Sequence, residues 1–128
     1  MEYLTLELFR SVAAGTAGRV YLMPPTSAET WQVLSISYLP QATSAANATN
    51  YGSLRPYKDT ATPTALAAAR TTASTALTQG TAENVTLTAS GADLEITQAD
   101  PLYIDMTHSG TGVAMDVLVA VRFQVLRS

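Results

Sequence analysis

The chain has 128 residues, enough for one domain with its own core, and it carries a formal net charge of −3. It contains no cysteine, which excludes disulfides and thiolate metal sites, and it has no basic run that could neutralise phosphates. Only 13% of its residues are charged, about half the usual share. Such a surface is typical of a protein that packs against other protein, although the base composition of a GC-rich genome would have the same effect.

The N-terminal segment predicts two strands. Leucines alternate with other residues over positions 3–9, which favours a strand, although the same leucines would also suit a short helix. A turn with two glycines over 13–18 leads into a short strand over 19–23. That strand ends at Pro24 and Pro25, because proline has no backbone N–H to donate to a sheet.

A second clear strand is predicted over residues 31–39, between a tryptophan and Pro40. Leu34, Ile36 and Tyr38 are spaced two apart, so we expect them on one face of that strand. The next segment, 41–62, is rich in Ala, Asn, Ser and Thr and predicts a long loop. Connections of this length are usually functional or disordered.

Residues 63–78 fit a short helix. Thr62 can cap its start, Pro63 suits its first turn, and Gly80 suits its far end. The threonines at 71, 72 and 75 count against the helix, because threonine loses rotamer freedom there.

Three short strands are predicted over 83–89, 93–97 and 102–107, and a long strand over 112–126. In the long strand, apolar residues occupy every second position from Val113 to Val125, so they would form one apolar face. At about 3.3 Å per residue it would be roughly 45–50 Å long. We therefore expect it to bend or bulge near Ala120, or to extend beyond its domain and pair with a neighbour.

Together these elements predict an all-β fold. We expect one domain over residues 1–128, an antiparallel β-sandwich of jelly-roll-like form with about eight strands. The start of the chain lacks the basic region of a signal peptide, and no stretch approaches the roughly 20 apolar residues needed to cross a bilayer. We therefore expect synthesis in a cytoplasm and no contact with membranes.

The sequence offers no catalytic or cofactor-binding motif. His108 is the only histidine, so a zinc triad cannot be built, and its place before a glycine turn predicts a solvated side chain. The acidic residues between 93 and 116 match no calcium loop, and charges at sheet edges that discourage aggregation explain them. Asp105 and Asp116 flank one turn and could meet across a hairpin. We predict no catalytic residue, metal ligand or cofactor.

Two segments are candidates for contact with a protein partner. The N-terminal strand could expose its edge, and the loop over 41–62 combines tyrosines with basic residues. Tyrosine and arginine are enriched at interface hot spots, although the same tyrosines could instead anchor the loop to its own domain. The predicted interface residues are Tyr3, Leu4, Tyr51, Leu54, Arg55, Tyr57 and Lys58.

The layout of the chain resembles a known group of proteins. It has an N-terminal strand, a strand opened by Trp31, a long Ala/Asn/Thr loop, several short strands, and a turn from Ser109 to Gly112 into a long terminal strand. Small all-β virion proteins of tailed bacteriophages are similar, above all capsid decoration (cement) proteins. The resemblance covers most of the chain and rests on this layout.

The resemblance implies a structural, non-enzymatic protein on the capsid surface of a virion, made in the host cytoplasm. Such proteins commonly form homotrimers and bind the major capsid protein, which they brace at the joints between subunits. A tail or baseplate component is one alternative, and a carbohydrate-binding β-sandwich module is another. A small hydrolase would need a pocket with paired carboxylates, and the sequence disfavours it. Direct binding of nucleic acid is also disfavoured.

Overall fold

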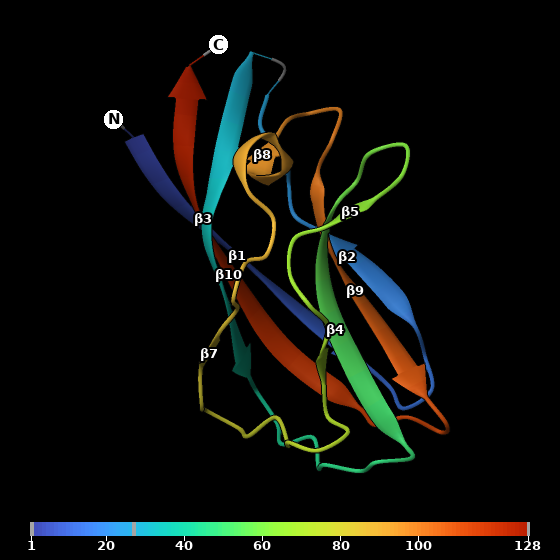
Figure 1. Cartoon of the computed structure of the whole chain (residues 1–128). Helices are drawn as coiled ribbons and strands as arrows, with labels where there is room; N and C mark the ends of the chain where they lie inside the picture. The colour runs from blue at the N-terminus through green and yellow to red at the C-terminus, as the bar shows by residue number, and fades with distance from the viewer. Residues whose placement is uncertain (1, 27, 128) are drawn as a thin grey trace.

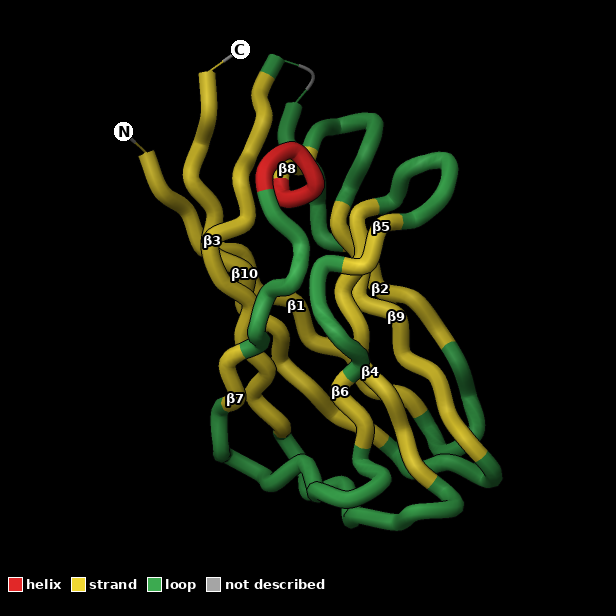
Figure 2. The backbone as a smooth tube through the Cα atoms, viewed as in Figure 1, coloured by secondary structure: helices red, strands yellow, loops and turns green. Residues whose placement is uncertain are grey.

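The computed structural model describes residues 2–26 and 28–127, and it is an antiparallel β-sandwich (Figure 1). Ten strands occur in the described part of the chain, against about eight predicted, with one short 3₁₀ turn, η1 (Gly91–Leu94). The strands form two five-stranded sheets that pack face to face, and the segments over residues 66–69 and 85–90 run along one side of the sandwich (Figure 2). The predicted fold class is confirmed.

The first sheet, here sheet A, contains the long strands. Its order is β1-β10-β3-β7, with β8 also paired to β3. The bounds are β1 (Glu2–Val12), β3 (Glu29–Pro40), β7 (Glu83–Asn84), β8 (Glu95–Ile96) and β10 (Met115–Arg127).

The second sheet, here sheet B, lies across the core from sheet A. Its order is β2-β9-β4-β5, with β6 also paired to β4. The bounds are β2 (Gly18–Tyr21), β4 (Tyr51–Lys58), β5 (Thr64–Ala65), β6 (Arg70–Thr71) and β9 (Leu102–Ser109).

Strand β10 is the centre of sheet A, with β1 along one side and β3 along the other. The alternation predicted for it is confirmed, because every second side chain from Met115 to Phe123 points into the sandwich and is fully buried, and Val125 is half-buried. β-branched and other apolar residues pack well at such positions. The fully buried side chains of β10 are Met115, Val117, Val119, Val121 and Phe123.

The irregularity expected in the long strand lies at a β-bulge opposite it. Arg122 of β10 faces Ser35 of β3, whereas the next residue, Phe123, faces Val33. Leu34 is therefore the extra residue, and a bulge of this kind re-aims the side chains around it. The shift lies two residues beyond the position predicted from sequence, and β10 pairs within its own domain.

The bulge corrects one prediction about β3. Leu34 was expected to share a face with Ile36 and Tyr38, but its side chain is 37% exposed, whereas those two are buried. Val33 points inward in its place, at 1% exposure. One extra residue shifts the alternation of the strand by one position. Side chains on one side of the bulge therefore point to the opposite face from the one that a period of two predicts.

The helix predicted over residues 63–78 is wrong. This segment instead contains β5 and β6 and runs along the edge of β4. Thr72 exchanges backbone and side-chain bonds with Gly52: the Thr72 N–H donates to the Gly52 carbonyl (3.0 Å), and the Gly52 N–H donates to Thr72 Oγ1 (3.0 Å). Threonine hydroxyls compete in this way with helical hydrogen bonds.

The long loop predicted over residues 41–62 is also corrected, because its second half is β4. Burial alternates along β4, and Gly52, Leu54 and Pro56 face the core. The inward positions of this strand include Gly52 and Pro56, which are not typical strand residues. The alternation of buried and exposed positions was therefore not visible in the sequence. The predicted strands over 83–89 and 93–97 are shortened to β7 and β8, with η1 occupying part of the second.

His108 is half-buried and joins two turns, rather than being solvated as predicted. The Val113 N–H donates to Nδ1 (3.4 Å), so Nε2 carries the proton and donates to the Thr16 carbonyl (3.0 Å). A Cβ on Gly112, where φ is +72°, would lie 2.4 Å from Nδ1. The histidine ring thus fixes the turn that precedes β10.

Candidate partner-binding surface

Three tyrosines line up across the outer face of sheet B. In the strand register, Tyr21 of β2 lies opposite Tyr103 of β9, and Tyr103 lies opposite Tyr57 of β4. The ring centroids of Tyr57 and Tyr103 are 5.2 Å apart with the planes stacked at 13°. Tyr21 and Tyr103 are also 5.2 Å apart, tilted at 44°. Such cross-strand aromatic pairs stabilise a sheet beyond the area that they bury.

A charged row runs beside the tyrosines. Each of the three strands has a charged residue two positions from its tyrosine. Arg19 lies opposite Asp105, and Asp105 lies opposite Arg55. The Arg19 guanidinium lies 4.5 Å above the Tyr103 ring, and that of Arg55 lies 5.6 Å from the Tyr57 ring. Both distances are within the range of a cation–π interaction. The six residues of the tyrosine–arginine face are Arg19, Tyr21, Arg55, Tyr57, Tyr103 and Asp105.

The electrostatics of this face follow from its packing. Tyr103 is covered by its neighbours and only 1% exposed, and this burial raises the pKa of its phenol. A hydrogen bond with Tyr21 raises the pKa of the Arg19 guanidinium. The Tyr21 hydroxyl donates to Asp59 Oδ2 (3.2 Å), and Arg55 Nε donates to the Ala67 carbonyl (2.9 Å). These bonds hold the face in one conformation, which reduces the entropy that binding would cost.

The arrangement does not suit stacking of sugar rings. A sugar needs the open face of an aromatic ring, but Tyr103 has Tyr57 stacked on it and Arg19 above it. Arg55 lies over Tyr57. The aromatic surface left for a ligand is mainly that of Tyr21, which is 47% exposed. This geometry disfavours the carbohydrate-binding alternative.

The structure divides the seven predicted interface residues between the two sheets. Arg55 and Tyr57 belong to the tyrosine–arginine face, and Tyr51 and Lys58 lie at the two ends of the same strand. Lys58 Nζ donates to the Ala92 carbonyl (3.0 Å). Leu54 is 0% exposed, so it is a core residue that no partner can reach in the folded protein.

Tyr3 and Leu4 lie apart from this group, on β1 in sheet A. Tyr3 faces outward at 50% exposure, with the guanidinium of Arg122 5.2 Å from its ring centroid. Leu4 faces inward and packs, half-buried, against the core. The predicted set therefore does not form one surface.

Four residues of the tyrosine–arginine face were missed by the sequence reasoning: Arg19, Tyr21, Tyr103 and Asp105. A signal for them exists, because each of three strands carries a tyrosine and a charged residue two positions apart. These pairs are Arg19 with Tyr21, Arg55 with Tyr57, and Tyr103 with Asp105. The spacing puts both members of a pair on one face of their strand. Only the register shows that the three pairs adjoin.

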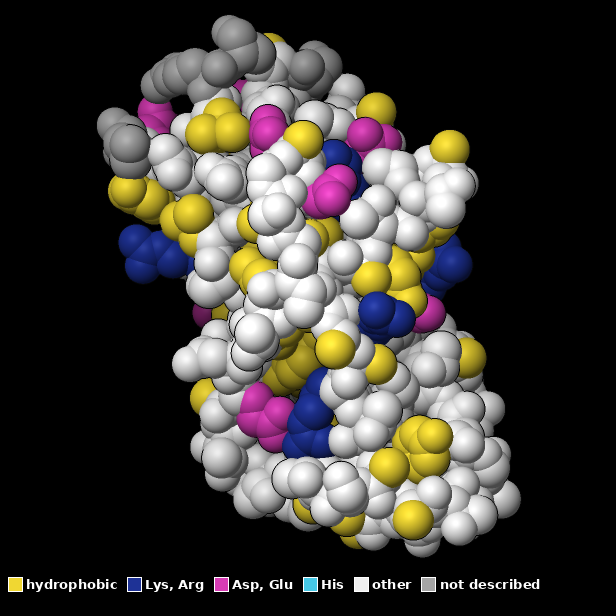
Figure 3. Space-filling view, in the orientation of Figure 1, with side chains coloured by type: hydrophobic (Ala, Val, Ile, Leu, Met, Phe, Trp, Pro, Cys, Tyr) yellow, Lys and Arg dark blue, Asp and Glu magenta, His cyan; other side chains and the backbone are white. Residues whose placement is uncertain are grey.

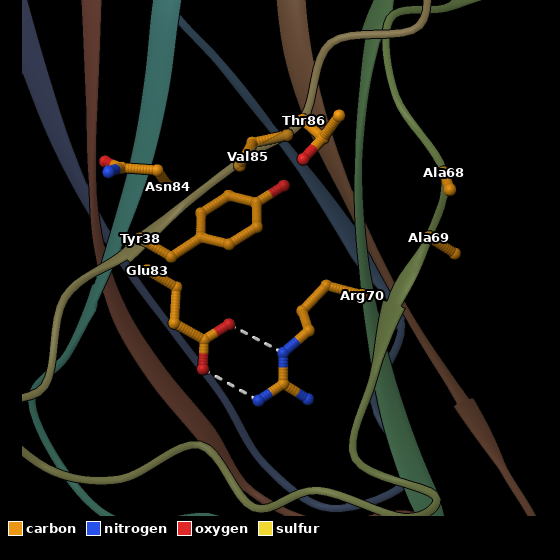
Figure 4. Close-up of a pocket in the computed structure, with 8 residues that line it drawn as sticks. All are labelled: Tyr38, Ala68, Ala69, Arg70, Glu83, Asn84, Val85 and Thr86. Atoms are coloured by element: carbon orange, nitrogen blue, oxygen red, sulfur yellow. Dashed lines mark hydrogen bonds and ion pairs between the residues drawn. The ribbon is translucent and has the colours of Figure 1, made fainter.

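A pocket of about 200 Å³ opens between the sheets, on the opposite side of β4 from β9 (Figure 4). Arg70 and Glu83 close its rim with a bidentate ion pair, Nε to Oε1 at 2.7 Å and Nη2 to Oε2 at 2.7 Å. The bond to Glu83 raises the pKa of Arg70. The Tyr38 hydroxyl is buried at the pocket and has no hydrogen-bond partner among the described residues.

The acidic residues do not gather into a site. Asp105 lies on sheet B, and Asp116, on sheet A, accepts a hydrogen bond from the Ser11 hydroxyl, so the two carboxylates do not meet across a hairpin. Among residues 2–26 and 28–127, no group of three or more His, Asp or Glu side chains could hold a metal ion. The same part of the chain has no helix long and apolar enough to span a membrane.

Few charged side chains interrupt the surface, which is mostly uncharged in the view of Figure 3. This agrees with the low charge content of the sequence. Large apolar side chains are exposed at five described positions, two of them on β1, one on β2, one after β2 and one at the bulge of β3. They are Tyr3, Phe9, Tyr21, Met23 and Leu34.

No protein-family model and no curated protein sequence matches the chain. Among solved structures, it is similar to one of Bacillus endospore appendages, described as disulfide-linked pili. The TM-score is 0.45 at 13% identity, over 95% of this chain and 88% of that one. It is also similar to a structure of infectious bursal disease virus, Gt strain, with a TM-score of 0.34 at 11% identity. That match covers 99% of this chain and 42% of the other, so this chain spans less than half of that one's length.

Proposed function

We propose that the chain is a non-enzymatic structural protein of a phage virion, and that it decorates the capsid by binding the major capsid protein. The observation that carries this is the tyrosine–arginine face. It is a patch on the outside of a sheet in which Tyr21, Tyr57 and two arginines surround the buried ring of Tyr103, held by cross-strand stacking. Aromatic and arginine side chains of this kind are typical of interface hot spots.

Two further features support the proposal. The low charge of the chain reduces the desolvation cost of burying its surface against protein. The sandwich also presents the outer face of a five-stranded sheet to a partner, and a standard interface needs about 800 Å² per partner. On a capsid, many copies would add weak contacts into stable binding.

The proposal is tested by co-sedimentation of the purified protein with shells assembled from the major capsid protein of the same phage. We expect binding at a fixed ratio, and we expect Arg55→Ala with Tyr57→Ala to weaken it at least about tenfold, as truncation of hot-spot residues does. Arg122→Ala, on the outer face of sheet A, is the matched control and should bind normally. Absence of binding by the folded wild-type protein would contradict the capsid role.

A tail or baseplate component remains the alternative. Co-sedimentation with purified tails distinguishes it, because a tail protein would bind there and ignore empty shells. The homotrimer that the resemblance implies stays a prediction, and a solution mass of three times 13.5 kDa would confirm it.

A further inference from the structure

Strand β1 is a long edge strand with a neighbour on one side only. It pairs with β10 at every position from Glu2↔Val125 to Val12↔Met115, without a register shift. No other described strand pairs with it, and its start lies at the outside of the sheet, beside the end of β10 (Figure 1). Edge strands are usually protected by being short, by proline or by a bulge. None of these protects β1, which has eleven residues.

The inward row of side chains on this edge is apolar near its middle, and the outward row has an aromatic ring on either side of Thr5 and Glu7. The inward row includes Leu4, Leu6 and Leu8, which are half-buried and pack against the core cluster. The outward row includes Tyr3 and Phe9, which are 50% and 54% exposed. A further strand placed beside β1 would complete the burial of the leucines and cover the two rings.

We propose that this strand is β1 of a second copy, paired antiparallel about a two-fold axis that passes beside Leu6. In this register Leu6 faces its own counterpart, and Leu4 faces Leu8 of the second copy. Tyr3 then faces Phe9 of the second copy. Aliphatic and aromatic cross-strand pairs of this kind stabilise an antiparallel ladder. An isologous contact of this type closes on itself and yields a dimer.

Charge complementarity selects this register. It places Glu2 opposite Arg10 of the second copy, at both ends of the paired segment. Arg10 Nε is shielded from solvent and has no hydrogen-bond partner among the described residues, and within residues 2–26 and 28–127 no carboxylate forms an ion pair with this guanidinium. Cross-strand pairs of opposite charge are favourable, and they also fix register.

The neighbouring registers give less favourable cross-strand pairs. A slide of two residues one way puts Glu7 opposite Glu7, which is repulsive. The same slide the other way puts Glu7 opposite Tyr3 and leaves Arg10 with no partner. A slide of one residue would face inward side chains with outward ones. The self-complementary pairing is therefore a property of the sequence from Glu2 to Arg10.

The first test uses cysteines, because the chain has none of its own. In Leu6→Cys the two thiols would face each other with Cα atoms about 4.5–5.5 Å apart, within the range that a disulfide spans. In Leu4→Cys or Leu8→Cys alone they would be about 13 Å apart. We expect mild oxidation to link Leu6→Cys to itself and the other two only when mixed. Cross-linking of Leu8→Cys to itself, or of none of these variants, would overturn the register.

The second test exchanges charges, with the mass in solution as readout. The wild type should have twice 13.5 kDa. Arg10→Glu alone and Glu2→Arg alone should each raise the dimer dissociation constant about tenfold, since two attractive pairs become repulsive. Glu2→Arg combined with Arg10→Glu should restore the dimer. These residues lie about 26 Å apart within one strand, so they cannot pair with each other in one chain, and a rescue can arise only between copies.

A third variant separates dimer loss from unfolding. Thr5 lies opposite Arg122 on β10, so Thr5→Glu leaves the monomer a favourable cross-strand pair but places a carboxylate opposite Glu7 of the second copy. We expect a folded monomer of 13.5 kDa, with the same circular dichroism spectrum as the wild type. A wild-type monomer at all concentrations, or a trimer that Thr5→Glu leaves intact, would refute the proposal.

Discussion

At the scale of single residues, burial of Tyr38 has two opposing effects on the stability of the core. The ring packs between the sheets at 2% exposure, which favours folding through its apolar surface. The hydroxyl, however, is buried with no partner among the described residues, and an unsatisfied buried polar group costs about 1–3 kcal/mol. The alternation of β3 predicted that Tyr38 faces inward, but no sequence pattern could show what its hydroxyl would meet.

We therefore expect Tyr38→Phe to stabilise the protein. The substitution keeps the ring and removes the unsatisfied hydroxyl, so the free energy of unfolding should rise by about 1 kcal/mol. Urea denaturation at neutral pH measures it, with Tyr51→Phe, at the end of β4, as the matched control. A loss of stability in Tyr38→Phe would mean that the hydroxyl is bonded in solution.

At the scale of elements, the two sheets use their strands differently. In sheet A the central strand, β10, contributes more buried apolar side chains than any other described strand. It has an apolar inner face, and it is paired with a strand on each side. In sheet B the outer face contributes as well, because Tyr57, Tyr103 and Tyr21 stack across three strands. The inner face of a strand can be predicted from its period of two. A ladder across strands depends on register, which is set by contacts far apart in sequence.

The stacking of Tyr57 on Tyr103 should be measurable as a coupling energy. We expect Tyr103→Ala to cost about 3–5 kcal/mol, in the range of buried aromatic truncations. Tyr57→Ala should cost less, because its ring is only half-buried. The double variant should fall short of the sum by about 0.5–1.5 kcal/mol. Strict additivity in this double-mutant cycle would show that the rings do not interact.

At the scale of the whole molecule, the stability of the sandwich should depend on alkaline pH. Burial raises the pKa of Tyr38 and of Tyr103 above the ordinary value of 10.0. Above about pH 10 the unfolded chain loses these two protons while the folded protein keeps them. The folded state then binds more protons, so stability is complete below the unfolded pKa and falls as pH rises beyond it.

Thermal or urea unfolding between about pH 8 and pH 11 tests this expectation. The wild type should lose stability over the upper part of this range, and Tyr38→Phe with Tyr103→Phe should lose distinctly less. If the double variant declined as steeply as the wild type, other groups would control the alkaline limb.

The sequence by itself determined the class of fold and the inner faces of β1 and β10. These features rest on a local period of two, which any eleven-residue window of β1 or β10 contains. Only the tertiary structure decided that residues 51–58 form a strand, that 63–78 do not form a helix, and that Leu34 is bulged outward. It also decided which tyrosines and arginines adjoin. The physical reason is the same in each case: these outcomes depend on pairing between segments distant in the chain, where burial and backbone hydrogen bonds outweigh local propensity.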